Sequence, residues 1–167
     1  GSFEHSGGHL TNVGSVLNEG VYTVSGGTFS ANRVTIVNPF QNAAGNSGNG
    51  IGTLNLSGGT TDISGELVLS GAGQSQSTLN VSGNAMVNLS GSTIVGMASG
   101  LPTGKRQINV SGGSVQAAQV IAGQGIGAFG TIGISDGSFQ AESLTLGSGR
   151  NAAGSVTQIG GSVVLGG

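Results

Sequence analysis

Two histidines near the start of the chain are the residues best suited to metal binding or nucleophilic catalysis. His5 and His9 lie four residues apart, Glu4 precedes them, and the 167 residues contain no other histidine and no cysteine. Imidazoles at this spacing can share a metal ion when a helix places them on one face, but Ser6-Gly7-Gly8 turns the chain between them. Neither a metal site nor a Ser-His-Asp triad is therefore expected, because both would depend on this one pair of histidines.

Carboxylates are the second group that could do chemistry, since two of them on one face can cleave a glycosidic bond. The chain has six acidic residues, and three of them, Asp62, Glu66 and Glu142, fall near one point of a repeat that is described below. Glu142 comes two or three repeats after the others, which in a stack of strands places it about 10–15 Å away. That separation is too large for a retaining glycosidase, and one Tyr and no Trp leave little to stack on a sugar ring. Solvated edge charges are the favoured interpretation, and a carbohydrate-active β-helix enzyme, a polysaccharide lyase or hydrolase, is the alternative.

A glycine-rich string could bind phosphate groups. Gly125-Ile126-Gly127-Ala128-Phe129-Gly130 fits G-x-G-x-x-G, the dinucleotide fingerprint, which must follow a strand and open a helix. Here the next residues, Thr131-Ile132-Gly133-Ile134, alternate as a strand does. The string is therefore interpreted as a glycine corner between strands, and no cofactor is expected.

Four Asn-x-Ser sequences match the signal for N-glycosylation; they begin at Asn55, Asn80, Asn88 and Asn109. Three of them are the outward Asn and the corner Ser of three different repeat units, so asparagines that stack and bond to one another explain them without glycans. Threonines recur in the same units, at Thr53, Thr78 and Thr131. Ice-binding solenoids carry ranks of Thr-x-Thr on a flat face, whereas this sequence has a single file, so neither pattern is taken as a functional site.

These scattered candidates are positioned by an internal repeat. Ser-Gly-Gly or a close variant returns seven times, at intervals of 19, 32, 25, 29, 24 and 24 residues. A period of about 20 to 50 residues is the signature of a repeat architecture, and a stack of similar coils offers no obvious pocket. The first positions of this landmark are Ser6, Ser25, Ser57, Ser82, Ser111, Ser135 and, in degenerate form, Ile159.

Each unit holds three short alternating segments, and alternation predicts strands with one buried face. Relative to the landmark, the inward positions are −3 and −1, +4 and +6, and +9 and +11, as in Leu54 and Leu56 of one coil. The +4 column is expected to stack phenylalanine, methionine and valine, with Met86 as its methionine. In two units an extra residue in the second corner moves the last pair, to Leu67 and Leu69 and to Ser92 and Ile94.

Strands this short are stable only when stacked, each backbone pairing with the coils above and below at about 4.8 Å. No helical periodicity competes, and parallel crossovers are strongly right-handed. We therefore predict an all-β fold: a right-handed, single-stranded parallel β-helix, or three-sided β-solenoid, of about six to seven coils of about 24 residues. Residues 1–167 form a single β-solenoid domain, in which residues 1–19 are an atypical N-terminal coil and residues 20–167 are regular repeats.

Glycine corners and insertions at one corner complete the expected coil. Glycine allows the positive φ that a tight corner requires. The variable segments all follow the third strand and should protrude along one edge of the tube, where loops would carry recognition. They are residues 38–52, 71–77, 96–106, 123–130 and 147–155.

Composition excludes several classes of function. The net charge is −2 with only four Lys and Arg, so no basic surface can neutralise phosphates and no nucleic-acid partner is expected. No apolar run approaches the ~20 residues of a transmembrane helix. Hydrophobic residues make up 35% of the chain and charged residues 6%, which is the reverse of a disordered sequence.

The repeat unit resembles a known type of bacterial sequence. Residues 52–59 read Gly-Thr-Leu-Asn-Leu-Ser-Gly-Gly, and similar strings occupy residues 77–83, 106–113 and 130–137. They resemble the β-strand repeats of autotransporter (type V secretion) passengers and PEP-CTERM surface proteins, over roughly residues 20–167. The resemblance implies an exported protein, extracellular or on the bacterial cell surface, and it carries no catalytic residues. The 167 residues include neither the autotransporter barrel nor the PEP-CTERM sorting tail, so the mode of attachment is left open.

The sequence thus predicts a non-enzymatic structural solenoid: a stalk, an adhesin segment or a fibre subunit that stacks head-to-tail. No catalytic, cofactor-binding or metal-binding residue is assigned. The partners that fit are further copies of the chain, in a homo-oligomer or filament formed through the end coils, and a surface polysaccharide or host cell-surface ligand. His5 and Gln158 stand where other coils are apolar, which makes both end coils atypical. Whether the chain is part of a longer array or a complete polymerising subunit is left open.

Overall fold

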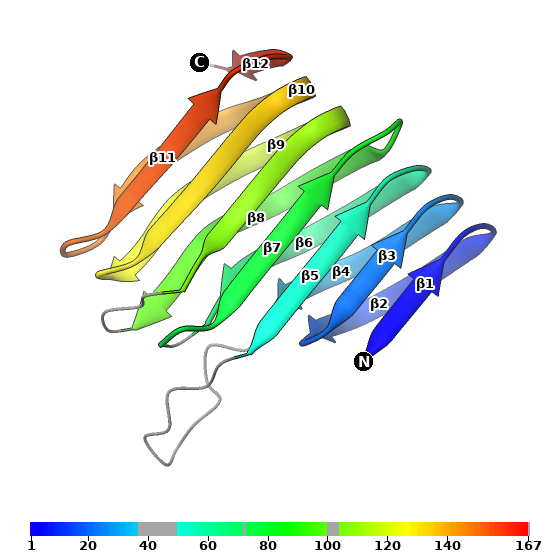
Figure 1. Ribbon diagram of the computed structural model, residues 1–167, viewed down its shortest axis with the longest axis horizontal. Coiled ribbons are helices and arrows are strands. Elements are labelled where there is room, and N and C mark those ends of the chain that lie inside the picture. The colour runs from blue at the N-terminus through cyan, green and yellow to red at the C-terminus, as the bar shows by residue number, and fades with distance from the viewer. Residues whose placement is uncertain (37–49, 72, 100–103, 167) are drawn as a thin grey trace.

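The protein is built from parallel β-strands that wind into a stack. The computed structural model describes residues 1–36, 50–71, 73–99 and 104–166, and these residues contain no helix. Twelve strands form one sheet (Figure 1). They are β1 (Ser2–His5), β2 (His9–Asn18), β3 (Val21–Val24), β4 (Thr28–Ile36), β5 (Ile51–Leu56), β6 (Thr60–Ser70), β7 (Gln76–Val81), β8 (Met86–Ser99), β9 (Arg106–Ile126), β10 (Phe129–Ser148), β11 (Ala153–Gln158) and β12 (Ser162–Leu165).

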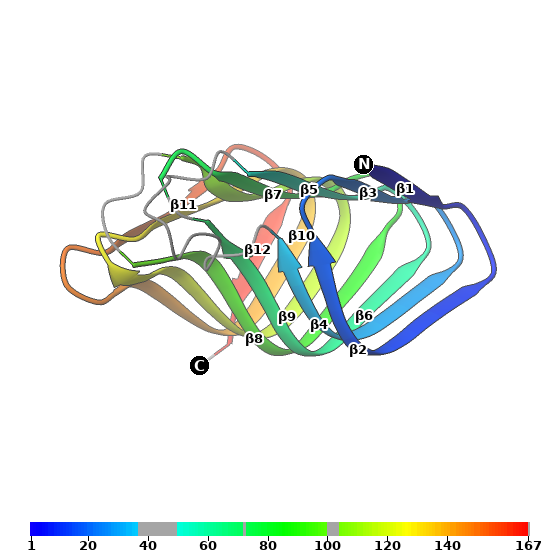
Figure 2. The same cartoon turned by 90° about the horizontal axis from the view of Figure 1, so that it is seen from below.

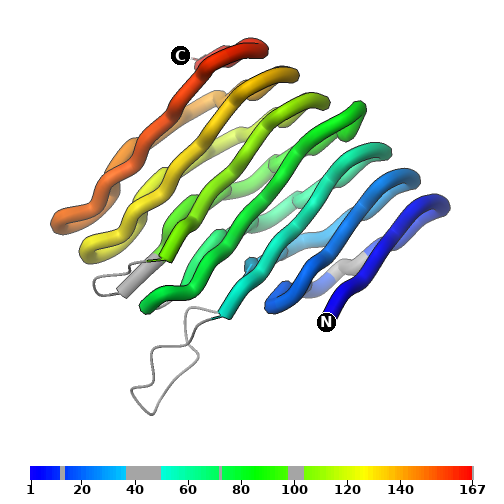
Figure 3. The backbone as a smooth tube through the Cα atoms, viewed as in Figure 1, coloured from blue at the N-terminus to red at the C-terminus, as the bar shows by residue number. Residues whose placement is uncertain are grey.

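Successive coils stack in register, as the alternation predicts. A layer that we call the first side contains β1, β3, β5, β7, the first residues of β9 and of β10, and β11 (Figures 1 and 3). Equivalent residues pair from coil to coil, for example Val24 with Leu56 and Leu56 with Val81. Every strand pair found among the described residues is parallel. The predicted class, an all-β parallel solenoid, is confirmed.

After the Ser-Gly-Gly corner each coil continues into a second, bent segment. This segment consists of β2, β4, β6, β8, the remainder of β9 and of β10, and β12, and it forms a layer apart from the first side (Figure 2). Register shifts interrupt its ladder, for example between Leu89 and Ser92, and mark a second corner. Because pairing continues around corners, β9 is 21 residues long, whereas the sequence suggested separate strands of a few residues.

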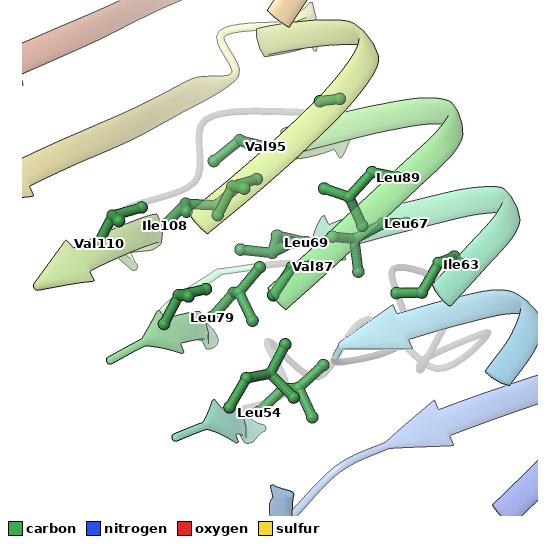
Figure 4. Close-up of a cluster of buried hydrophobic side chains, with 14 of the residues drawn as sticks. Leu54, Ile63, Leu67, Leu69, Leu79, Val87, Leu89, Val95, Ile108 and Val110 are labelled. Atoms are coloured by element: carbon green, nitrogen blue, oxygen red, sulfur yellow. The ribbon is translucent and has the colours of Figure 1, made fainter. Parts of the chain in front are cut away.

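The interior consists of mostly apolar columns, to each of which every coil contributes one side chain. Leu79 from the first side and Leu69 and Val87 from the second segment point into the same interior (Figure 4). Burial of one such side chain stabilises a fold by about 1.5–3 kcal/mol. Near the N-terminal end the interior becomes aromatic, with ring centroids 4.7 Å apart for Phe3 and Tyr22 and 5.3 Å apart for Tyr22 and Phe29.

The Ser-Gly-Gly corners have the backbone conformation that the sequence predicts. Gly27 and Gly59 have φ of 74° and 73°, where only glycine is free of strain. A Cβ atom on Gly59 would also overlap the carbonyl oxygen of Gly27 in the neighbouring coil. These corners follow one edge of the stack, and the turns that lead into β3, β7, β10 and β11 follow the opposite edge (Figure 1). Most of the predicted insertion at residues 38–52 and part of that at residues 96–106 lie outside the described residues.

One coil departs from the predicted register. The sequence places Met86 in the +4 column, but the structure pairs Val87 with Thr61 and with Val115. Met86 is 54% exposed, whereas Val87 is 1% exposed. The cause is the corner Ser82-Gly83-Asn84-Ala85, which is one residue longer than a Ser-Gly-Gly corner and is closed by a 3.3 Å bond from the Ala85 amide to the Ser82 carbonyl.

The same extra residue changes the last inward pair of that coil. The sequence predicts Ser92 and Ile94, but Thr93 pairs with Leu67 and Val95 with Leu69. The insertion in the second corner was recognised correctly, and the additional residue in the first corner was missed. Alternation alone cannot locate an added corner residue. The addition moves both members of the inward pair by one position, so their spacing of two residues stays the same.

Part of the second segment is covered on both faces. Leu67 and Leu69 point inward, yet Val68 between them is only 1% exposed, and its partner Ile94 is 4% exposed. The prediction that each strand buries only one face is therefore wrong for these residues. The outward residues here are themselves apolar, which is typical of strands buried on both faces.

Candidate functional site

The two histidines flank the first corner and do not form a joint site. His5 ends β1 and pairs with Val24, so it occupies an inward column, as predicted. Its Nε2 atom is buried without a hydrogen-bond partner, whereas His9 begins β2 and is exposed. In the described part of the chain no group of three His, Cys, Asp or Glu is placed to hold a metal ion.

The glycine-rich string joins two strands. β9 ends at Ile126 and β10 begins at Phe129, so no helix follows the string and the predicted strand does. The Gly127 amide donates to the carbonyl of Arg150 in the next coil at 2.9 Å. An amide that a neighbouring coil already uses is not available to a phosphate, which supports the interpretation as a corner.

The three acids near the second corner separate into two groups. Glu66 forms an ion pair of 2.9 Å with Arg33 on the surface, an interaction worth less than about 1 kcal/mol. Asp62 and Glu142 line a shared hollow. Three register steps separate the Asp62 coil from the Glu142 coil, at least about 14 Å at the spacing of strands, and even inverting glycosidases keep their carboxylates within about 9.5 Å.

This hollow is a groove along the second segment, with a volume of about 540 Å³. Its polar lining comes from four successive strands, β6, β8, β9 and β10, and Leu89, Ala117 and Ala118 also line it. The polar residues are Asp62, Asn88, Ser90, Gln116, Gln140 and Glu142. It is the feature of the described chain that most resembles a binding site, since it is concave and carries converging polar groups.

Strand pairing aligns the groove residues. Asp62 pairs with Asn88, Asn88 with Gln116, and Gln116 with Gln140, so one polar side chain recurs per coil along the stack. They point outward because their neighbours in the sequence, such as Thr61 and Ile63 beside Asp62, are buried. The sequence reasoning missed this row, although its members stand five or six residues after their landmarks.

Hydrogen bonding in the groove is incomplete. The Asn88 side-chain amide donates to the Asp62 carboxylate at 2.6 Å. Gln116 and Gln140 are exposed, and neither side chain has a hydrogen-bond partner in the described chain. Within the described ranges no Lys or Arg lines the groove, and the acids lie in its outermost coils, so the groove offers neutral amides bounded by negative charge.

Asparagines on the first side form the ladder that the sequence predicts. The Asn80 side chain donates to Asn55 and the Asn109 side chain donates to Asn80, each at 2.9 Å. The ladder stops where Asn109 pairs with Gly133, which has no side chain, and a second hollow of about 280 Å³ lies there. The threonines noted in the sequence do not form a continuous file, because Gln107 lies between Thr78 and Thr131 in the strand register.

One buried cation is a feature that sequence reasoning missed. Arg106 begins β9 and is 1% exposed, and it was expected at the end of a protruding loop. Its guanidinium donates to the carbonyl oxygens of Gly71 and, at 2.6 Å, of Gly104. Burial lowers the pKa of Arg106 from its ordinary value, although an arginine stays charged in proteins. The side chain bonds two backbone carbonyl oxygens, so its role is structural.

No protein-family model matches this chain, and no curated protein or solved structure is significantly similar to it. A search of the described residues for an apolar helix long enough to cross a bilayer found none.

Proposed function

We propose that this chain is a non-enzymatic structural β-solenoid of a bacterial surface or extracellular protein, acting as a stalk, an adhesin segment or a fibre subunit. The observation that carries the proposal is the backbone ladder, which pairs coil with coil from β1 to β11 on the first side. A parallel ladder around a dry apolar core makes a rigid rod. The extracellular location rests on the resemblance to autotransporter and PEP-CTERM repeats.

The finer architecture belongs to the same proposal. We take the solenoid to be right-handed and three-sided, with six to seven coils of about 24 residues, since parallel crossovers are almost always right-handed and each coil bends at a second corner. A rod of this kind supplies length and stiffness without a catalytic centre. The large separation of Asp62 from Glu142 supports the choice of a structural protein over a glycosidase.

Exposed apolar side chains on the first and last strands of the stack support end-to-end stacking. Phe3 at one end and Leu165 at the other belong to inward columns, yet they are 48% and 52% exposed. A further coil placed on either end would continue the backbone pairing and cover these side chains. In the proposal that coil comes from a second copy of the chain.

Electron microscopy of the purified chain over a range of concentrations tests the stacking. We expect fibres with an axial repeat near ~34 Å, the rise of about seven coils. Leu165→Lys, which puts a charge into the end column, should shorten or abolish them, whereas Gln119→Lys adds the same charge at an exposed position of β9, which has coils on both sides, and should not. Monodisperse short rods at every concentration would refute the fibre, and steady release of reducing ends from a polysaccharide would refute the non-enzymatic role.

A further inference from the structure

The two rows of side-chain amides in this molecule are used differently. On the first side Asn55, Asn80 and Asn109 bond to one another. In the groove Gln116 and Gln140 are register partners on adjacent coils, yet their amides make no hydrogen bond to the described chain. Each amide therefore presents an unused donor and an unused acceptor to whatever enters the groove.

We propose that the groove binds one extended strand of an uncharged polysaccharide, lying along the axis of the stack. The coils rise by about 4.8 Å, close to the length of one sugar unit in an extended chain. Asp62, Asn88, Gln116 and Gln140 would then meet successive sugar units. Amides and carboxylates pair well with neighbouring hydroxyls, because each offers two polar atoms in one plane. The inference rests on the proposed non-enzymatic function, since it requires a chain that is held and not cleaved.

The lining and the rigidity of the groove suit the same ligand. Ala118 lines it between the polar groups and is partly exposed, so its methyl group can contact the C–H face of a sugar, whereas the side chains of Leu89 and Ala117 belong to the core. The row is held in place by the pairing of β6, β8, β9 and β10. The backbone is therefore already ordered, and binding carries little entropic cost for ordering it.

Charge decides which polysaccharide fits. Asp62 and Glu142 bound the row and no basic residue lines it, so a polymer of uronic acids would meet like charges and find no cation. Among the described residues no aromatic ring lines the groove, and aromatic anchors are what give sugar sites much of their contact area. We therefore expect weak binding by a single site, with a Kd of about 0.1–1 mM.

Titration of the isotopically labelled chain with soluble oligosaccharides tests the proposal. Cellohexaose, mannohexaose and xylohexaose are the neutral probes, and hexagalacturonate is the anionic probe. At least one neutral hexamer should shift the backbone amide resonances of Asn88, Gln116 and Gln140. The double variant Gln116→Ala, Gln140→Ala should raise its Kd about tenfold, the loss of one to two hydrogen bonds.

Gln119→Ala is the matched control, because Gln119 is an exposed glutamine on the same coil and outside the groove. Its Kd should equal that of the unaltered chain. Any of three results would overturn the inference: no resonance shift with any of the three neutral hexamers, tighter binding of hexagalacturonate than of the neutral hexamers, or an equal rise in Kd for Gln119→Ala. Cleavage of a bound hexamer, seen as new reducing ends, would instead overturn the proposed function, so the two failures are distinguishable.

Discussion

At the scale of single residues, Arg106 shows how a solenoid accommodates an irregular corner. Its guanidinium donates to the carbonyl oxygens of Gly71 on the preceding coil and of Gly104 just before it in the chain. Arg106→Met keeps much of the volume but leaves both oxygens without their donor. We expect a loss of about 3 kcal/mol in the free energy of unfolding, measured by urea denaturation. Arg150→Met, at an exposed position, should change it by less than about 0.5 kcal/mol, and equal effects in both variants would contradict a structural role for Arg106.

Tyr22 gives a prediction about pH at the same scale. Burial raises the pKa of this phenol above its ordinary value of 10.0. Since the unfolded chain then loses its proton first, the Tyr22 contribution to stability is complete below about pH 10 and is lost as the pH rises beyond it. Tyr22 is the only tyrosine, so absorbance of the tyrosinate reports its titration directly. Tyr22→Phe should remove this part of the alkaline decline, and a pKa at or below 10.0 in the folded chain would contradict the expectation.

At the scale of the strand ladders, the break at Gly133 can be repaired. An added Cβ would lie 3.6 Å from the Asn109 side-chain oxygen, an ordinary contact. Gly133→Asn should therefore extend the asparagine ladder by one bond and stabilise the fold by about 1 kcal/mol beyond Gly133→Ala, which only removes the flexibility of glycine. Thermal unfolding compares the two variants. A Gly133→Asn variant no more stable than Gly133→Ala would mean that the ladder contributes nothing.

The strand ladders also separate what was predictable from what was not. Alternation correctly predicted the inward Leu54 and Leu56, because one buried face requires period two. It could not decide whether Met86 or Val87 is the inward residue. Both are apolar, and either choice leaves a first corner of ordinary length. Only stacking against Thr61 and Val115 decides, and that is a contact between coils. The burial of Val68 and Ile94 was missed because alternation does not say whether the outward face of a strand is also shielded from solvent.

At the scale of the whole molecule, stability should vary along the stack. Strand pairing joins each coil to the coils before and after it, so an end coil has one pairing partner where a central coil has two. We expect amide hydrogens of Leu79 and Ile108 to exchange at least about a hundredfold more slowly than those of Phe3 and Val163 in dilute solution. Hydrogen exchange followed by NMR measures this directly. Uniform protection would show that the stack opens as one unit, and protection of the ends that grows with concentration would reveal stacking between copies.

The candidate groove, unlike the fold, was not predicted from the sequence. Gln116 and Gln140 are ordinary outward polar residues in two different repeats, and only the register between coils joins them with Asp62 and Asn88. The distance between the carboxylates could be foreseen, since the rise per coil is fixed. The concavity could not, because it depends on how the second corner bends.

The unequal repeat intervals have a consequence for how such a chain can be altered. Thr28 and Thr60 are register partners 32 residues apart, whereas Ser114 and Ser138 are partners only 24 residues apart. The number of residues in a coil is thus independent of the rise from one coil to the next, because residues can be added between two strands without changing how the strands pair. A foreign peptide grafted between β10 and β11 would therefore be displayed at a fixed position along the stack.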